Sequence, residues 1–130
     1  MTQRQFVERL RPYLVDLESR VERKVPGSSG GISDGSVKHH GDVWSQLTLE
    51  FIPSGDAPLL WVMAYVKAED PLLHALVEFG RDEKVLGEFA PGPAPIEGDQ
   101  APAAALADAV GAFLLAQEER IVAELAARKS

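Results

Sequence analysis

The sequence predicts a single α+β domain with an N-terminal helix, an antiparallel sheet of three or four strands and a long C-terminal helix. Two observations favour this fold class: apolar residues recur at helical spacing near both ends of the chain, and they alternate with polar residues in between. Turn-forming residues separate the alternating runs, which is typical of antiparallel strands. The 130 residues suit one domain, which we place at residues 1–130.

Residues 2–24 are the first predicted helix. Thr2 and Gln5 match the capping-box pattern. One helical face carries the apolar residues Phe6, Leu10, Leu14, Leu17 and Val21. Pro12 removes a backbone hydrogen bond inside this helix, so we expect a kink or two abutting helices there.

The middle of the chain predicts a loop followed by strands. Segment 26–42 is rich in Gly, Ser, Asp and His, and it predicts an irregular loop. Residues 43–51 alternate as a strand with one buried face does, and 59–67 predict a second strand. Turn-forming residues at 53–56 connect the two, and 84–89 predict a further strand.

Residues 70–80 fit two structures. As a strand, apolar residues at every second position would face the core. As a helix, Asp70 would be the N-cap, Pro71 the first helical residue and Gly80 the C-terminal stop. The choice decides whether the domain has an additional strand or a central helix.

The C-terminal part begins with a stiff proline-rich connector, 91–95. From about Gln100 to Arg128 the sequence predicts one long alanine-rich helix. Its outer face offers charge pairs four residues apart, among Arg120, Glu124 and Arg128.

Composition narrows the function classes. The formal charge of −7 repels phosphate backbones, so direct nucleic-acid binding is not expected. The absence of cysteine excludes thiol nucleophiles, disulfides and cysteine-ligated zinc. The chain opens without an apolar signal segment, and no apolar run approaches the roughly 20 residues that span a bilayer. We therefore expect a cytoplasmic protein without membrane contact.

Motifs of catalytic type lack their structural context. Gly31–Gly35 matches the G-x-S-x-G nucleophile elbow, but glycine and serine flank it instead of a strand and a helix. His39 and His40 are adjacent, and neighbouring side chains of an extended chain point to opposite sides, so they should not share a metal ion. We expect no catalytic residue, no cofactor and no metal site.

The aromatic residues are more informative. In the first two strands, every second side chain is regularly apolar. If these side chains face the helices, the opposite face carries Trp44, Trp61, Met63 and Tyr65. Two long amphipathic helices pack most simply on one side of the sheet, which leaves this face too apolar for water. Trp, Tyr and Met are enriched at interfaces, so these four residues are the predicted partner-binding site. The alternative is an ordinary core, covered by a helix or by segment 26–42.

Two stretches carry a family resemblance. They are Asp70-Pro71-Leu72-Leu73-x2-Leu76 and the closing apolar series Leu106, Val110, Phe113, Leu114, Ile121 and Leu125. With the small size, the acidity and the order of elements, they resemble the type III secretion chaperones and the similar YbjN-type bacterial proteins, which have a central helix at the first stretch. The resemblance implies a non-enzymatic homodimer that binds a partner protein through helix and sheet surfaces, and no catalytic residues carry over.

We therefore expect a non-enzymatic, homodimeric, protein-binding adaptor or chaperone-like domain that binds a basic partner protein through the apolar sheet face. One alternative is a small-molecule binder or minor enzyme with a pocket between the 26–42 loop and the sheet, using His39, His40 or Glu50. Another is an immunity or antitoxin-like inhibitor whose acidity complements a basic toxin.

Overall fold

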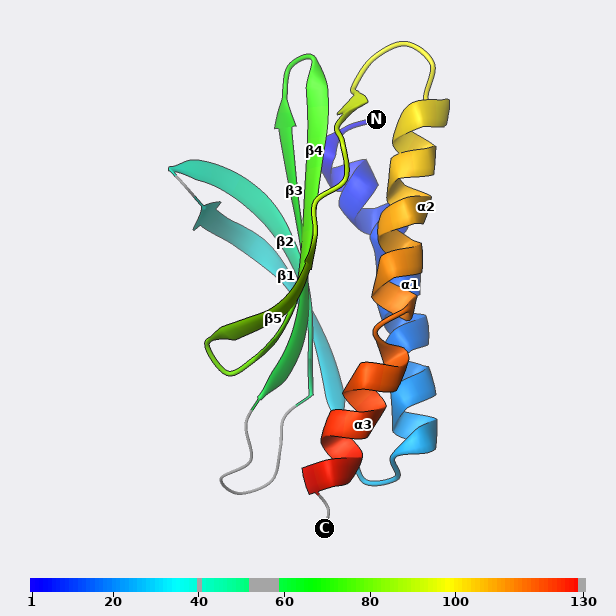
Figure 1. The fold of residues 1–130 in the computed structure, drawn as a ribbon. Helices are drawn as coiled ribbons and strands as arrows, with labels where there is room; N and C mark the ends of the chain where they lie inside the picture. Colours follow the sequence, from blue (N-terminus) through cyan, green and yellow to red (C-terminus); the bar gives the residue numbers. More distant parts are fainter. Residues whose placement is uncertain (40, 52–58, 129–130) are drawn as a thin grey trace.

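The computed structural model describes residues 1–39, 41–51 and 59–128 (Figure 1). Its elements are α1 (Gln3–Lys24), β1 (Gly30–His39), β2 (Asp42–Phe51), β3 (Leu60–Glu69), β4 (Leu72–Arg81), β5 (Lys84–Phe89), β6 (Ala94–Pro95), α2 (Ala101–Leu115) and α3 (Glu118–Arg128). The predicted α+β class is confirmed, with helices before and after one antiparallel sheet. The sheet has six strands rather than the three or four expected.

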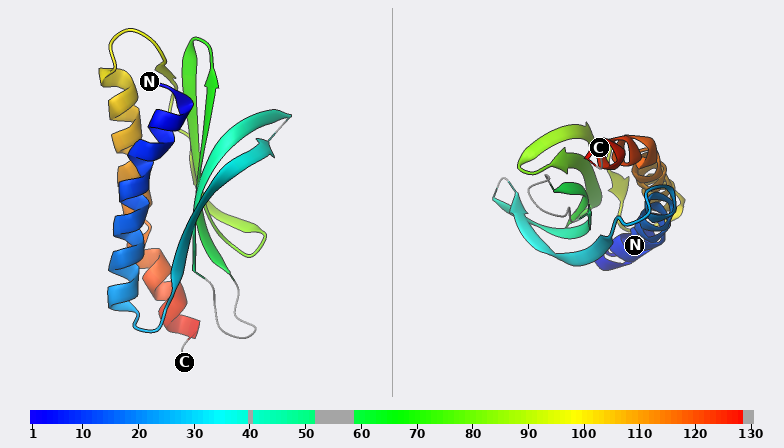
Figure 2. Two further views of the ribbon diagram at one scale, coloured as in Figure 1. Left: turned by 180° about the vertical axis from the view of Figure 1, so that it is seen from behind. Right: turned by 90° about the horizontal axis from the view of Figure 1, so that it is seen from below.

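The sheet is a meander in which chain order and spatial order agree, β1-β2-β3-β4-β5, and the short β6 pairs with β4. All these pairs are antiparallel. The helices lie on one face, and the outer strands bend away from them, so the opposite face is concave (Figures 1 and 2). We call this helix-free side the concave face.

The core lies between the sheet and the helices. Period-two alternation in the three inner strands sends one set of side chains toward the helices. This set comprises Leu47, Leu49, Phe51, Leu60, Val62, Ala64, Val66, Leu73, Ala75, Val77 and Phe79, all buried. No helix among the described residues is long and apolar enough to cross a membrane.

Helix α1 begins with the predicted capping box: Gln5 N donates to Thr2 Oγ1 at 3.1 Å, and Thr2 N donates to Gln5 Oε1 at 2.8 Å. The helix runs through Pro12 as one element, so the possibility of two abutting helices is wrong. Pro12 lies on the exposed side, where water can satisfy the carbonyl that loses its intrahelical donor.

The predicted loop over 26–42 is also wrong, because β1 occupies most of it. This strand pairs with β2 along its whole length, from Gly30 opposite Phe51 to His39 opposite Asp42. An edge strand of small polar residues is held by its backbone ladder and needs no buried face, so periodicity gave no signal.

Residues 70–80, which fitted both a strand and a helix, form β4. Leu73 and Val77 are fully buried on the helix side, while Leu76 and Glu78 are half-buried on the concave face. The segment lies between β3 and β5 and pairs with both, which explains why it forms a strand and not a helix.

The single C-terminal helix predicted over 100–128 is wrong in one respect, because it is divided into α2 and α3. Gln117 lies at the break, is buried, and donates from Nε2 to Phe113 O at 3.0 Å. Glu118 and Glu119 then occupy the first turn of α3, where the helix dipole favours negative charge. After the break, α3 lies near the end of β4. There Arg81, the last residue of β4, forms an ion pair with Glu124 of α3 at 3.2 Å.

Candidate functional site

The four predicted partner-binding residues all lie on the concave face. In the register of β2 with β3, Gln46 lies opposite Tyr65, and Thr48 lies opposite Met63. Trp44 and Trp61 lie at opposite ends of the same area, on β2 and β3. This face has no helix, because α1, α2 and α3 all pack on the other side of the sheet (Figure 2).

Trp61 is part of the folded chain's own packing. Its side chain is 7% exposed, and its indole lies against Gly80, the residue opposite it in β4. Indole Nε1 donates to Asp82 O at 2.6 Å, so the polar end of the ring is satisfied. Asp82 lies in the turn between β4 and β5, and its backbone N donates to Leu59 O at 2.8 Å, which fixes this turn beside β3. Trp61 therefore supports the floor of the concave face.

Tyr65 is also buried, at 8% exposure. Its hydroxyl donates to Met63 Sδ at 3.0 Å. Burial, followed by the nearby negative charge of Glu78, raises the pKa of Tyr65 to about 12. This phenol stays protonated at neutral pH.

Trp44 and Met63 are half-buried and remain accessible from the concave face. Lys67 Nζ lies 5.6 Å from the centre of the Trp44 ring, within reach of a cation–π interaction. The same ammonium pairs with Asp42 and Glu69, each at 2.7 Å, and hydrogen bonds to these carboxylates raise the pKa of Lys67. Its positive charge is therefore already compensated within the chain.

The four residues thus divide into two pairs. Trp61 and Tyr65 form a buried floor, and Trp44 and Met63 form the part that another molecule could contact. The accessible apolar surface is smaller than the sequence indicated, because Trp61 packs over Gly80 and Tyr65 is buried. A role of these residues in partner binding stays a prediction.

The concave face also gathers negative charge. Glu78 lies directly opposite Glu88 in the register of β4 with β5, and Glu50 lies opposite Trp61. Like charges in directly opposite positions destabilise a sheet slightly unless another group relieves them. With Lys67 already paired, this area presents carboxylates beside an apolar floor.

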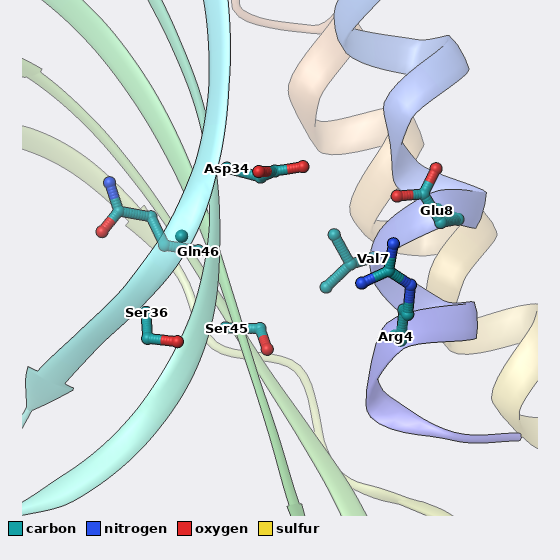
Figure 3. A pocket seen from close by; sticks show the side chains of 8 residues that line it. Arg4, Val7, Glu8, Asp34, Ser36, Ser45 and Gln46 are labelled. Carbon is teal, nitrogen blue, oxygen red and sulfur yellow. The ribbon is translucent and has the colours of Figure 1, made fainter.

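A second hollow, of about 280 Å³, lies between α1 and the β1–β2 hairpin (Figure 3). Its walls are formed by Arg4, Val7, Glu8, Asp34, Gly35, Ser36, Ser45 and Gln46. Arg11 bridges the two acids of this set, with Nη2 at 2.6 Å from Asp34 and Nε at 3.2 Å from Glu8. Hydrogen bonding to Arg11 lowers the pKa of Glu8. These contacts tie the helix to the edge strand.

The predicted pocket between a 26–42 loop and the sheet is not built by a loop, because most of this segment is the edge strand β1; a small-molecule site near it stays a prediction. His39 ends β1 opposite Asp42, whereas Glu50 lies eight residues further along β2. At about 3.3 Å per residue this separates them by roughly 26 Å, so they cannot share a small pocket. His40 lies outside the described residues.

No group of three or more His, Asp or Glu side chains is placed to hold a metal ion within residues 1–39, 41–51 and 59–128. No known protein family, curated protein or solved structure matches the chain. The chaperone-like resemblance therefore stays a prediction, and it loses its first stretch, because the segment expected to match a central helix is β4.

Proposed function

We propose that this chain is a non-enzymatic, homodimeric, adaptor or chaperone-like domain that binds a basic, amphipathic segment of a partner protein on its concave face. The observation that carries the proposal is the one-sided packing of the helices, which leaves Trp44 and Met63 on a face without a helix (Figure 2). Aromatic and methionine side chains are enriched where proteins bind one another.

The charge of the same face supports a basic partner. Glu50, Glu78 and Glu88 surround the apolar floor, and the chain as a whole carries a net charge of −7. Complementary charge steers association and orients the partner, while the apolar contact supplies most of the affinity. A segment with one apolar and one basic face meets both requirements.

A peptide titration tests this proposal. The probe is a lysine- and leucine-rich amphipathic peptide, followed by tryptophan fluorescence, since both tryptophans lie on the concave face. We expect a saturable change that weakens with added salt. A peptide of equal length with glutamate in place of lysine should not bind.

Matched variants locate the binding. Glu88→Lys and Trp44→Ala should each weaken binding several-fold, while Glu97→Lys makes the same charge change on the connector before α2 and should leave it unchanged. If neither face variant weakens binding while both remain folded, or if wild-type protein does not bind the basic peptide, the proposal is wrong.

A further inference from the structure

The free edge of β1 is the surface that carries a further inference. β1 is the first strand in the sheet order, so it pairs with β2 and lies at the outer edge. In an antiparallel pair, every second residue turns its N–H and C=O away from the partner strand. A row of outward-turned backbone groups is a template for another strand.

β1 lacks several of the features that usually protect an edge strand. It is 10 residues long, contains no proline, and keeps an unbroken register with β2 from end to end. Most of its side chains are small, and a methyl group added at Gly31 or Gly35 would meet nothing within 4 Å. Short length, proline, bulges and dense charge are the common ways to prevent edge pairing.

The hairpin of β1 and β2 also projects away from the helices (Figures 1 and 2). Near its base, α1 is close, since a Cβ at Gly30 would lie 2.9 Å from Glu18 Cγ. Toward its tip the hairpin is exposed, and Val43, opposite Lys38, is 57% exposed. The outer half of β1 is therefore the part that another strand can reach.

The charged residues of β1 favour one particular partner. Among residues 30–39 they are Asp34 and Lys38, four positions apart on the same face of the strand. If a second β1 runs antiparallel to the first with Ser36 opposite Ser36, Asp34 of each copy lies opposite Lys38 of the other. A twofold axis makes both contacts at once, which is the self-complementarity of an isologous interface.

The alternative registers are less favourable. Centring the pair on Asp34 places two carboxylates directly opposite each other, and like charges in that position destabilise a sheet. Lys38 is exposed and has no ion-pair partner among the residues that the structure describes. Asp34 is 59% exposed although it pairs with Arg11, so it can still accept a second cation.

We propose that β1 pairs antiparallel with β1 of a second copy, centred on Ser36, and joins the two sheets into one. Each copy contributes the five strands of its main path, so the concave faces become neighbours on a continuous sheet. This inference rests on the homodimer of the proposed function and names its interface. Two neighbouring peptide-binding faces would also bind a long basic segment more tightly than one face does.

Sedimentation equilibrium with charge-exchange variants tests the interface. Lys38→Asp places carboxylates opposite each other at both contacts, and Asp34→Lys places ammonium groups there, so each should weaken the dimer roughly tenfold. The double variant Asp34→Lys/Lys38→Asp restores opposite charges and should recover dimerisation. Lys84→Asp makes the same charge change on β5, at the other side of the sheet, and should have no effect.

Concentration-dependent hydrogen exchange supplies a second measurement. Amides of β1 should gain protection as the protein concentration rises through the dimer dissociation constant, while amides of β5 should not. A wild-type monomer, a dimer that tolerates Lys38→Asp, or a double variant that remains monomeric would each overturn the proposed interface.

The outcome is separable from that of the proposed function. Lys38 lies on the helix-side face of β1, so a monomeric Lys38→Asp variant retains an intact concave face. Suppose that wild-type protein is already monomeric, and that both it and the Lys38→Asp variant bind the basic peptide. The proposed interface is then wrong, while the peptide-binding role stands. If wild-type protein dimerises through β1 but does not bind the basic peptide, the interface stands and the peptide-binding role is wrong.

Discussion

The indole of Trp61 occupies the space above Gly80, its direct neighbour across the β3–β4 pair. A Cβ at Gly80 would lie 2.1 Å from Trp61 Cζ2, far inside van der Waals contact. Because β4 has no side chain at this position, the ring can cross it and reach the Asp82 carbonyl. This contact explains why an indole on the helix-free face is only 7% exposed.

Gly80→Ala should therefore displace the Trp61 indole. We expect the free energy of unfolding to fall by about 1–3 kcal/mol, the usual cost of overpacking a well-filled site. Chemical denaturation measures this change, and tryptophan quenching should show increased solvent access. Gly31→Ala, where a Cβ meets nothing within 4 Å, is the control and should change stability little. Equal effects of the two substitutions would contradict the packing.

The stability of the protein should decrease at alkaline pH because of Tyr65. Its pKa is about 12 in the folded state, against about 10 for an exposed phenol in the unfolded chain. Between these values the unfolded state has lost the proton while the folded state retains it, so stability present below about pH 10 is lost as the pH rises toward 12. Denaturation midpoints measured across this range test the direction.

Tyr13→Phe leaves Tyr65 as the one tyrosine of the chain, so tyrosinate absorbance then reports its titration alone. We expect a midpoint well above 10, and a lower midpoint when Glu78→Gln removes the neighbouring negative charge. A midpoint near 10 in the folded Tyr13→Phe protein would show that Tyr65 is solvated.

The close approach of α1 and α2 depends on Gly111. A Cβ there would lie 2.4 Å from Tyr13 Cε2, whose ring also donates through its hydroxyl to Asp108 Oδ1 at 3.1 Å. Gly111→Ala should therefore destabilise the protein by about 1–2 kcal/mol, although alanine is about 1 kcal/mol better than glycine within a helix.

The effect of Gly111→Ala on stability should reverse once the Tyr13 ring is removed. In a Tyr13→Ala background, Gly111→Ala should stabilise the protein by up to about 1 kcal/mol, because the helix propensity then acts alone. A double-mutant cycle by urea denaturation measures the coupling. Additive effects of the two substitutions would mean that the ring does not occupy this space.

Helix α3 should loosen when Arg120 is removed. Its guanidinium lies 5.0 Å from the centre of the Phe79 ring and points to Leu86 O at 3.4 Å, so it connects α3 to both β4 and β5. Arg120→Ala should cost about 0.5–1 kcal/mol and speed hydrogen exchange in α3 more than in α2. Arg4→Ala, which removes an exposed arginine from α1, should leave the exchange of α3 unchanged.

The sequence was informative where a buried face imposes a period. Leu10, Leu14 and Leu17 mark the inner side of α1, and Leu47 and Leu49 mark that of β2, so these elements could be predicted from their spacing alone. It was uninformative for β1, whose glycines and serines bury little and whose pairing depends on the backbone of β2. The division between α2 and α3 was missed because the buried residues continue at helical spacing through Gln117, so the spacing gives no sign of a break.

The amino-acid sequence by itself determined the α+β class, the order of the main elements and the set of large residues opposite the helices, because all three follow from apolar periodicity. Only the tertiary structure decided how these large residues are used. The missing side chain at Gly80 lets Trp61 pack into the protein, while Trp44 stays half-buried and accessible. Such contacts join residues far apart in the chain, and local spacing contains no information about them.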